Sequence, residues 1–167
     1  ITNGNLNISG SYLLKDVNLS VKNTMTISGE TVVDIDGGEA HDASVKAGNL
    51  TAGGETAVAG DTIDIANADV QVNGITTIYK NGTLNLTNVY KKGEGDAKEA
   101  SKLGFLKADG EDPNRRGTTL NIESSKIEIS GIRAGGDNAG HFTGALDDNI
   151  MRYFGTVNVS GVSDVKV

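Results

Sequence analysis

Few residues in this sequence have side chains suited to catalysis. There is no cysteine, and the two histidines are His41 and His141. Thiolate metal sites and disulfides are therefore excluded, and acid–base chemistry by histidine has only two candidates. Because no Gly-x-Ser-x-Gly nucleophile elbow occurs either, we expect a protein that is not an enzyme, with no catalytic residue.

Acidic clusters are the candidates for metal binding, because calcium takes six to eight oxygen ligands, often from closely spaced carboxylates. Three clusters occur: Asp34, Asp36, Glu39 and Asp42; Asp109, Glu111, Asp112 and Asn114; and Asp147, Asp148 and Asn149. We keep Asp109, Glu111 and Asp112 as candidate calcium ligands. Since no cluster matches an EF-hand loop or the glycine-rich calcium-binding nonapeptide, we favour solvated loop charge and expect no cofactor.

Arginines near acidic residues offer a different chemistry, the binding of an acidic sugar. They are Arg115, Arg116, Arg133 and Arg152. A polysaccharide-active enzyme would gather such cations and carboxylates in one cleft, whereas exposed ion pairs contribute little. Aromatic residues make up only 4% of the chain, so stacking platforms for sugar rings are scarce and this enzyme stays an alternative.

The strongest recognition candidates are aromatic and basic residues in segments that lack strand patterning. They are His141, Phe142, Arg152, Tyr153 and Phe154, together with Phe105. Interfaces are enriched in these residue types, and loops on a rigid scaffold commonly carry recognition. The alternative is that the rings only pin their own loops onto the scaffold.

A recurring strand phrase indicates the scaffold that must position these residues. Apolar residues alternate with polar ones in Thr62-Ile63-Asp64-Ile65, Thr83-Leu84-Asn85-Leu86, Thr119-Leu120-Asn121-Ile122 and Thr156-Val157-Asn158-Val159, and in Asn5-Leu6-Asn7-Ile8. A period of two predicts strands with one buried and one wet face. Three such pieces, at 62–65, 69–72 and 76–79, precede the next phrase, as in one turn of a parallel β-helix.

The spacing of the phrases predicts both the fold and its interruptions. Extra residues between the later phrases are assigned to insertions at about 91–117 and 133–154, and a smaller insertion is assigned to about 36–48. Within the second, Asp96 to Leu106 has the composition of a short helix. We expect a single all-β domain over 1–167, a right-handed parallel β-solenoid with loop insertions; a β-sandwich is the alternative.

Composition and charge exclude two classes of partner. The chain is acidic, with a net charge of −7 and a pI of about 4.7, and an acidic surface repels nucleic acid and anionic membranes. We therefore expect neither nucleic-acid binding nor membrane insertion by this segment. The 23 glycines and the single proline, Pro113, suit many corners and uninterrupted ladders. Strand patterns at both ends suit either a piece of a longer repeat array or a chain whose ends stack on neighbouring subunits.

The phrases GTLNLTN, TLNIESSKIEISG and GTVNVSGVSDVKV resemble the repeats of bacterial autotransporter passengers and filamentous-haemagglutinin-like exoproteins. That resemblance implies a β-helix displayed on the bacterial cell surface or secreted, which adheres to a protein or glycan of a host or neighbouring cell. It transfers no functional residue. We therefore expect a structural adhesin segment that binds through its insertions, or alternatively a self-assembling subunit of an extracellular filament or surface layer.

Overall fold

Short β-strands with alternating apolar and polar side chains make up the fold. The computed structural model describes residues 4–10, 12–27, 32–52, 62–79, 82–109, 119–134 and 156–167. These residues form eighteen strands and no helix. None of them, accordingly, belongs to a helix that could cross a membrane.

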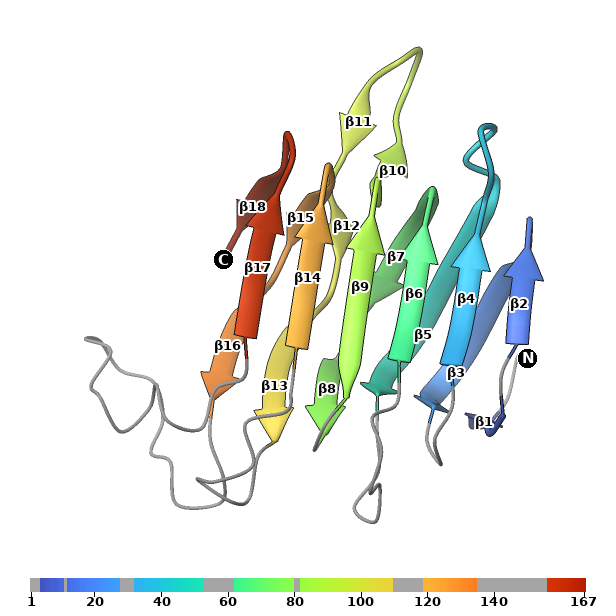
Figure 1. The fold of residues 1–167 in the computed structure, drawn as a ribbon, viewed down its shortest axis with the longest axis vertical. Coiled ribbons are helices and arrows are strands. Elements are labelled where there is room, and N and C mark those ends of the chain that lie inside the picture. The colour runs from blue at the N-terminus through green and yellow to red at the C-terminus, as the bar shows by residue number, and fades with distance from the viewer. Residues whose placement is uncertain are drawn as a thin grey trace.

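One sheet is built from the recurring phrase and runs across the front of Figure 1. Its strands, in spatial order, are β2 (Tyr12–Lys15), β4 (Val32–Asp36), β6 (Thr62–Ala66), β9 (Thr83–Thr87), β14 (Thr119–Glu123) and β17 (Thr156–Ser160). All neighbours are parallel. Ile63, Leu84, Leu120 and Val157 are direct partners, so the sequence spacings do mark equivalent strands.

A second sheet lies behind the first and has two parts. The first part holds the segments that directly follow the front strands in the chain. In spatial order they are Asn18–Val21 of β3 (Asn18–Ile27), Ala43–Ala47 of β5 (Ala43–Ala52), β7 (Ala68–Val72), β12 (Ser101–Lys102), β15 (Lys126–Glu128) and β18 (Asp164–Lys166).

The other part of this sheet holds β1 (Leu6–Ile8), the second halves of β3 and β5, β8 (Ile75–Tyr79), β13 (Phe105–Asp109) and β16 (Gly131–Ala134). The two parts join through β3 and β5, which pair in both. Each repeat thus contributes three successive strand segments, and each segment pairs in parallel with its equivalent in the next repeat. The predicted all-β fold is confirmed as one of parallel sheets.

The predicted helix over Asp96–Leu106 is wrong. Lys98–Glu99 forms β11, which pairs antiparallel with β10 (Lys91–Lys92), and the chain then returns to the parallel sheet as β12 and β13. Buried Ser101 and Leu103 alternate with exposed Lys102. Good helix-forming residues therefore lie in strands, because pairing with neighbouring repeats outweighs local propensity.

The insertion boundaries also need correction. The range 36–48 includes the start of β5, so only the turn at 37–42 separates strands there. The range 91–117 includes β12 and β13, and 133–154 includes the end of β16. Of the remainder, 91–100 contains the β10–β11 hairpin, whereas 110–117 and 135–154 lie outside the described residues. Charged composition misled the prediction because outward positions of ladder strands are also charged.

The first phrase occupies a different place from the others. Leu6–Ile8 pairs with Met25–Ile27 of β3 rather than with a strand of the front sheet. Its alternation is the same, so the sequence pattern alone does not distinguish the sheets.

The core consists of stacked columns of aliphatic side chains. Val33, Ile63, Leu84 and Leu120 form one column of the front sheet, and all are buried. Val45, Val70 and Ile127 belong to a facing column. No tryptophan is needed, because each repeat only fills a layer one strand spacing thick, roughly 4.8 Å.

The corner that follows a front strand begins with a left-handed residue after five of the six strands, all except β4. Asp16, Asn67, Asn88 and Ser124 have φ between 51° and 53°, and Gly161 has φ 66°. Asparagine, aspartate and glycine tolerate this conformation best. Asn67 Nδ2 donates to Asp36 Oδ1 and Asn88 Nδ2 to Asn67 Oδ1, each at 2.8 Å. Repetition of the corner therefore keeps the repeats aligned.

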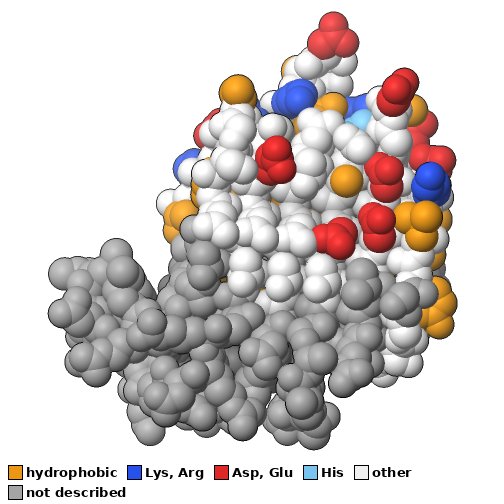
Figure 2. All heavy atoms as spheres, viewed as in Figure 1, with side chains coloured by type: hydrophobic (Ala, Val, Ile, Leu, Met, Phe, Trp, Pro, Cys, Tyr) orange, Lys and Arg blue, Asp and Glu red, His pale blue; other side chains and the backbone are white. Residues whose placement is uncertain are grey.

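The outer surface of the front sheet, called the amide face below, carries a hydrogen-bonded column of side chains. Asn121 Nδ2 donates to Asn85 Oδ1 at 2.6 Å, and Asn158 Nδ2 donates to Asn121 Oδ1 at 2.7 Å. Asn85 Nδ2 donates in turn to Asp64 Oδ1. Most of this face is neither charged nor hydrophobic, with acidic side chains gathered on the side of β4 and β6 (Figure 2). These side chains therefore hydrogen-bond to one another along the ladder.

Candidate functional site

The β10–β11 hairpin is a segment that leaves the parallel ladder, and the structure describes all of its residues. The chain leaves the ladder after Val89 and rejoins it at Ser101. Lys91 Nζ donates to Glu99 Oε2 at 2.6 Å across the hairpin, and Gly93 N donates to Ala97 O at 2.9 Å. The hydrogen bond with Glu99 raises the pKa of Lys91, and the same bond lowers the pKa of Glu99.

Buried serine hydroxyls fix both ends of the hairpin. Val89 N donates to Ser125 Oγ at 2.8 Å, and Ser125 is 2% exposed. Val70 N donates to Ser101 Oγ at 3.0 Å, and that hydroxyl donates to Asp69 Oδ1 at 3.0 Å. Ser101 is fully buried in a column that is otherwise aliphatic. A buried hydroxyl must be hydrogen-bonded to avoid a penalty, so these bonds hold the hairpin ends in one position.

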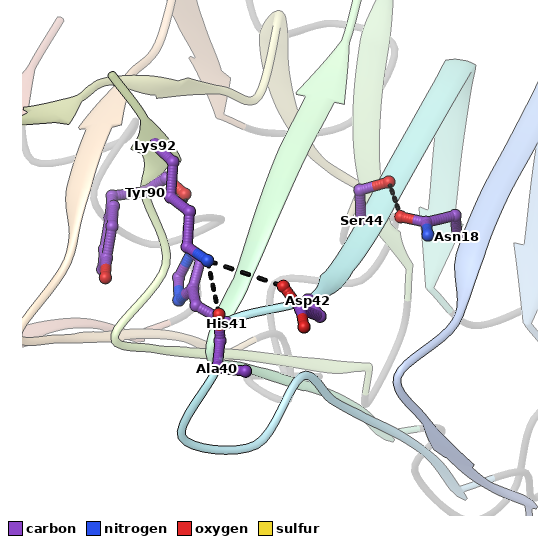
Figure 3. A network of polar contacts seen from close by, with 7 residues as sticks. All are labelled: Asn18, Ala40, His41, Asp42, Ser44, Tyr90 and Lys92. Atoms are coloured by element: carbon purple, nitrogen blue, oxygen red, sulfur yellow. Dashed lines mark hydrogen bonds and ion pairs between the residues drawn. The ribbon is translucent and has the colours of Figure 1, made fainter. Parts of the chain in front are cut away.

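The hairpin is clamped to the turn at 37–42 by an aromatic stack. The His41 and Tyr90 rings lie 3.9 Å apart at 19°, and Lys98 Nζ lies 4.2 Å from the centre of the Tyr90 ring. Lys92 Nζ donates to Ala40 O and lies 3.5 Å from Asp42 Oδ1 (Figure 3). Contacts of Tyr90 and Lys92 therefore fasten the β10 side of the hairpin to the turn between β4 and β5, whereas Lys98 of β11 contacts the Tyr90 ring within the hairpin.

His41 in this clamp is held as the neutral imidazole. It is 6% exposed, and its Nε2 lies 2.8 Å from Tyr90 O, which can only accept, so Nε2 carries the proton. Nδ1 is buried with no partner among the described residues. Burial lowers the pKa of His41, and the charges of Lys92 and Lys98 lower it further, while the Tyr90 carbonyl and Asp69 act in the opposite direction.

A groove of ≈ 460 Å³ lies between the hairpin and the outer surface of β5, β7, β12 and β15. That size falls within the range of small-molecule sites, roughly 300–1,000 Å³. The residues that line it are Lys46, Asp69, Gln71, Lys91, Glu99, Ala100, Lys102 and Glu128. We call this surface of the second sheet the groove face. Seven of the eight lining residues are polar or charged, so the groove suits a hydrophilic ligand.

Some charged side chains of the groove form bonds within the protein, and others do not. Lys91 and Glu99 pair with each other, and Asp69 Oδ1 accepts from Gln71 Nε2 at 2.7 Å as well as from Ser101. Within the part of the chain that the structure describes, Lys46, Lys102 and Glu128 form no ion pair. The groove therefore presents two ammonium groups and the Glu128 carboxylate without internal partners, beside the Asp69 carboxylate, which is hydrogen-bonded to neutral donors and keeps its charge.

The recognition residues expected from sequence are placed only in part. Phe105 lies in β13 and not in a loop; it is 38% exposed, and its ring covers Gly131 of the next repeat. The other five, His141, Phe142, Arg152, Tyr153 and Phe154, lie outside the described residues, so their role stays a prediction.

Among the candidate calcium ligands, Glu111 and Asp112 lie outside the described residues, and only the backbone of Asp109 is placed, at the end of β13. In the first acidic cluster, Asp36 accepts from Gly38 N at 2.9 Å and Asp42 contacts Lys92. No group of three metal-ligating side chains occurs within the described ranges.

Sequence reasoning overlooked the groove residues because they lie far apart in the chain. Lys46, Gln71, Lys102 and Glu128 are ordinary polar positions of separate strands. Alignment of the second strands of successive repeats would have placed them in one column, since they are register partners.

Comparison with known proteins assigns no family to the chain. No protein-family model matches the sequence, and neither a curated protein nor a solved structure matches it.

Proposed function

We propose that this chain is a non-catalytic structural segment of a secreted or surface-displayed bacterial adhesin, wound as a right-handed parallel β-solenoid. The single observation that carries the proposal is the in-register parallel pairing of three strand segments per repeat. Such an arrangement grows along one axis and contacts only its neighbouring repeats. It supplies a stiff support from which departures such as the β10–β11 hairpin project.

The side chains fit a support that works in water outside the cell. The amide column satisfies its own hydrogen-bonding groups, the surface is acidic overall, and cysteine is absent. Recognition in this proposal lies on the hairpin, the groove beside it and the segments around 110–118 and 135–155, and the partner is a protein or glycan of a cell surface.

Two measurements test the proposal. Small-angle X-ray scattering should give an elongated particle whose length follows the number of repeats. Beads coated with the chain should adhere to at least one member of a panel of immobilised glycans and extracellular-matrix proteins, and replacement of 91–98 by a short glycine linker should weaken adhesion. A spherical particle would contradict the solenoid, and beads that adhere no better than albumin-coated ones would contradict the adhesin.

A self-assembling subunit is the second candidate, and the ends of the described ladder favour it. Leu13 at one end is 58% exposed, and Val159, Val162 and Val167 at the other are 53%, 96% and 69% exposed. Apolar side chains and unpaired strand edges at both ends suit stacking of copies end to end. Sedimentation velocity should then show polymers that grow with concentration, and Leu6→Pro or Val165→Pro should abolish them; a monomer at every concentration would exclude this candidate.

A further inference from the structure

We propose that the groove face binds a linear acidic polysaccharide in which carboxylated sugars alternate with neutral ones. The inference rests on the proposed function, because it takes recognition to occur at departures from the ladder, and it names the ligand class. Its basis is a column of outward side chains in register: Lys46, Gln71, Lys102, Glu128 and Lys166.

The lysines occupy alternate positions of this column. Lys46 and Lys102 are separated by Gln71, and Lys102 and Lys166 are separated by Glu128. With a strand spacing of roughly 4.8 Å, their backbones recur about every 10 Å. A two-sugar repeat of an extended polysaccharide has a length of the same order, so successive carboxylates of the ligand can meet successive ammonium groups.

The residues between the lysines suit the neutral sugars. Gln71 has amide donors and an acceptor, and Glu128 is an acceptor, as sugar hydroxyls require. Gln71 is ordered by its bond to Asp69. The lysines are exposed and unpaired within the described ranges, so they lose no internal ion pair when they bind an anion.

The same column disfavours other polyanions. A nucleic acid carries a phosphate at every nucleotide and would bring one against Glu128, on a protein of net charge −7. An extended acidic peptide usually adds to a free sheet edge and fills apolar pockets, whereas this groove lies on a sheet face and Ala100 is its one apolar lining residue.

The hairpin gives the groove a fixed wall. Lys91 and Glu99 line the groove and bond to each other, while the His41–Tyr90 stack fastens the hairpin to the turn between β4 and β5. A wall that is already ordered reduces the entropy lost when a flexible glycan binds.

The test is isothermal titration calorimetry of the 1–167 chain with a short hyaluronan oligosaccharide, in which carboxylated and neutral sugars alternate. The groove variant combines Lys46→Gln with Lys102→Gln. The matched control combines Lys15→Gln with Lys22→Gln, which removes the same two charges from exposed positions outside the groove. We expect the groove variant to lose affinity by at least about tenfold, with the control close to the unaltered chain.

Three further titrations determine the ligand class. Carboxyl-reduced hyaluronan should bind far more weakly if the lysines meet carboxylates. A polyglutamate peptide and a single-stranded oligonucleotide should both bind more weakly than hyaluronan, and tighter binding of either would overturn the polysaccharide assignment.

No heat of binding with hyaluronan, or equal losses in the groove and control variants, would overturn the inference about the groove. Those outcomes leave the adhesin proposal intact if the coated beads still adhere to the panel. Failure of the beads together with binding of hyaluronan in solution would instead contradict the adhesin and retain the groove.

Discussion

The amide face and the groove face are built on the same repeats but use their polar side chains differently. On the amide face, Asn85, Asn121 and Asn158 donate to one another or to Asp64, and few groups are left for a partner. On the groove face, Lys46, Lys102 and Glu128 have no ion pair among the described residues. One surface therefore uses its polar side chains to stabilise the ladder, whereas the other leaves charged side chains without an ion pair among the described residues.

Both faces depend on the same core, and its disruption should give the largest effect. Leu84→Ala removes a fully buried side chain from the column under β9, and we expect a loss of about 2–5 kcal/mol in the free energy of unfolding. Urea denaturation measures it. The neighbouring outward substitution Thr83→Ala should cost much less, and equal losses would mean that the two sides of β9 do not differ.

The hairpin beside the groove should make stability depend on pH. Because the pKa of His41 is lowered from 6.5 in the folded chain, the unfolded chain takes up the proton first as pH falls. The free energy of unfolding should therefore decrease below about pH 6.5, by at most about 1.4 kcal/mol per pH unit, until the folded imidazole is also protonated.

Denaturation between about pH 8 and pH 5 checks this against His41→Asn, in which asparagine tolerates the φ of 53°. The slope due to His41 should disappear in that variant, while any contribution of His141 remains. An unchanged slope would assign the pH dependence to other groups.

The two faces are compared most directly by paired substitutions. Asn121→Ala breaks the bonds to Asn85 and Asn158 and should cost about 1 kcal/mol. Lys102→Ala should change stability by less than about 0.5 kcal/mol. Thermal denaturation of both variants suffices, and the distinction between the faces fails if Lys102→Ala is the more damaging.

The smallest effect on stability is expected from a substitution at Asp34, at the end of the amide column where aspartates replace asparagines. Asp34 is the register partner of Asp64, and its pKa is raised by burial first, and then by the charges of Asp64 and Asp36. Because a raised pKa disfavours the ionised form in the fold, Asp34→Asn should stabilise the chain at neutral pH. Solvent screening limits the gain to a few tenths of a kcal/mol. The gain should vanish below about pH 3, where Asp34 is protonated in both states; an undiminished gain there would exclude a charge effect.

Strand positions were predictable from sequence where alternation and spacing agree. The 21 residues from Ile63 to Leu84 contain three strands, as expected, because one repeat needs no inserted segment there. The strands around Ser101 and Phe105 were missed, since their alternation includes a buried serine and a glycine corner. Gly104 has φ 62° and packs against the backbone of Gly74.

The candidate site was less predictable than the fold. Its residues come from four strands and a hairpin, and their proximity follows only from register. The His41–Tyr90 stack joins positions 49 residues apart, and no local pattern marks such a pair. Aromatic content instead drew attention to the segment around 141–154, which lies outside the described residues.

The attachment of the hairpin has a consequence for how such a chain diversifies. Val89 and Ser101 each hold their place through a serine hydroxyl and through backbone pairing with adjacent repeats, whereas the backbone hydrogen bonds described for residues 91–98 lie within the hairpin. We therefore expect that residues 91–98 can be replaced by another sequence. Substitution or recombination there can alter what the surface presents, or an engineer can graft a foreign epitope, while the register of every repeat on either side is preserved.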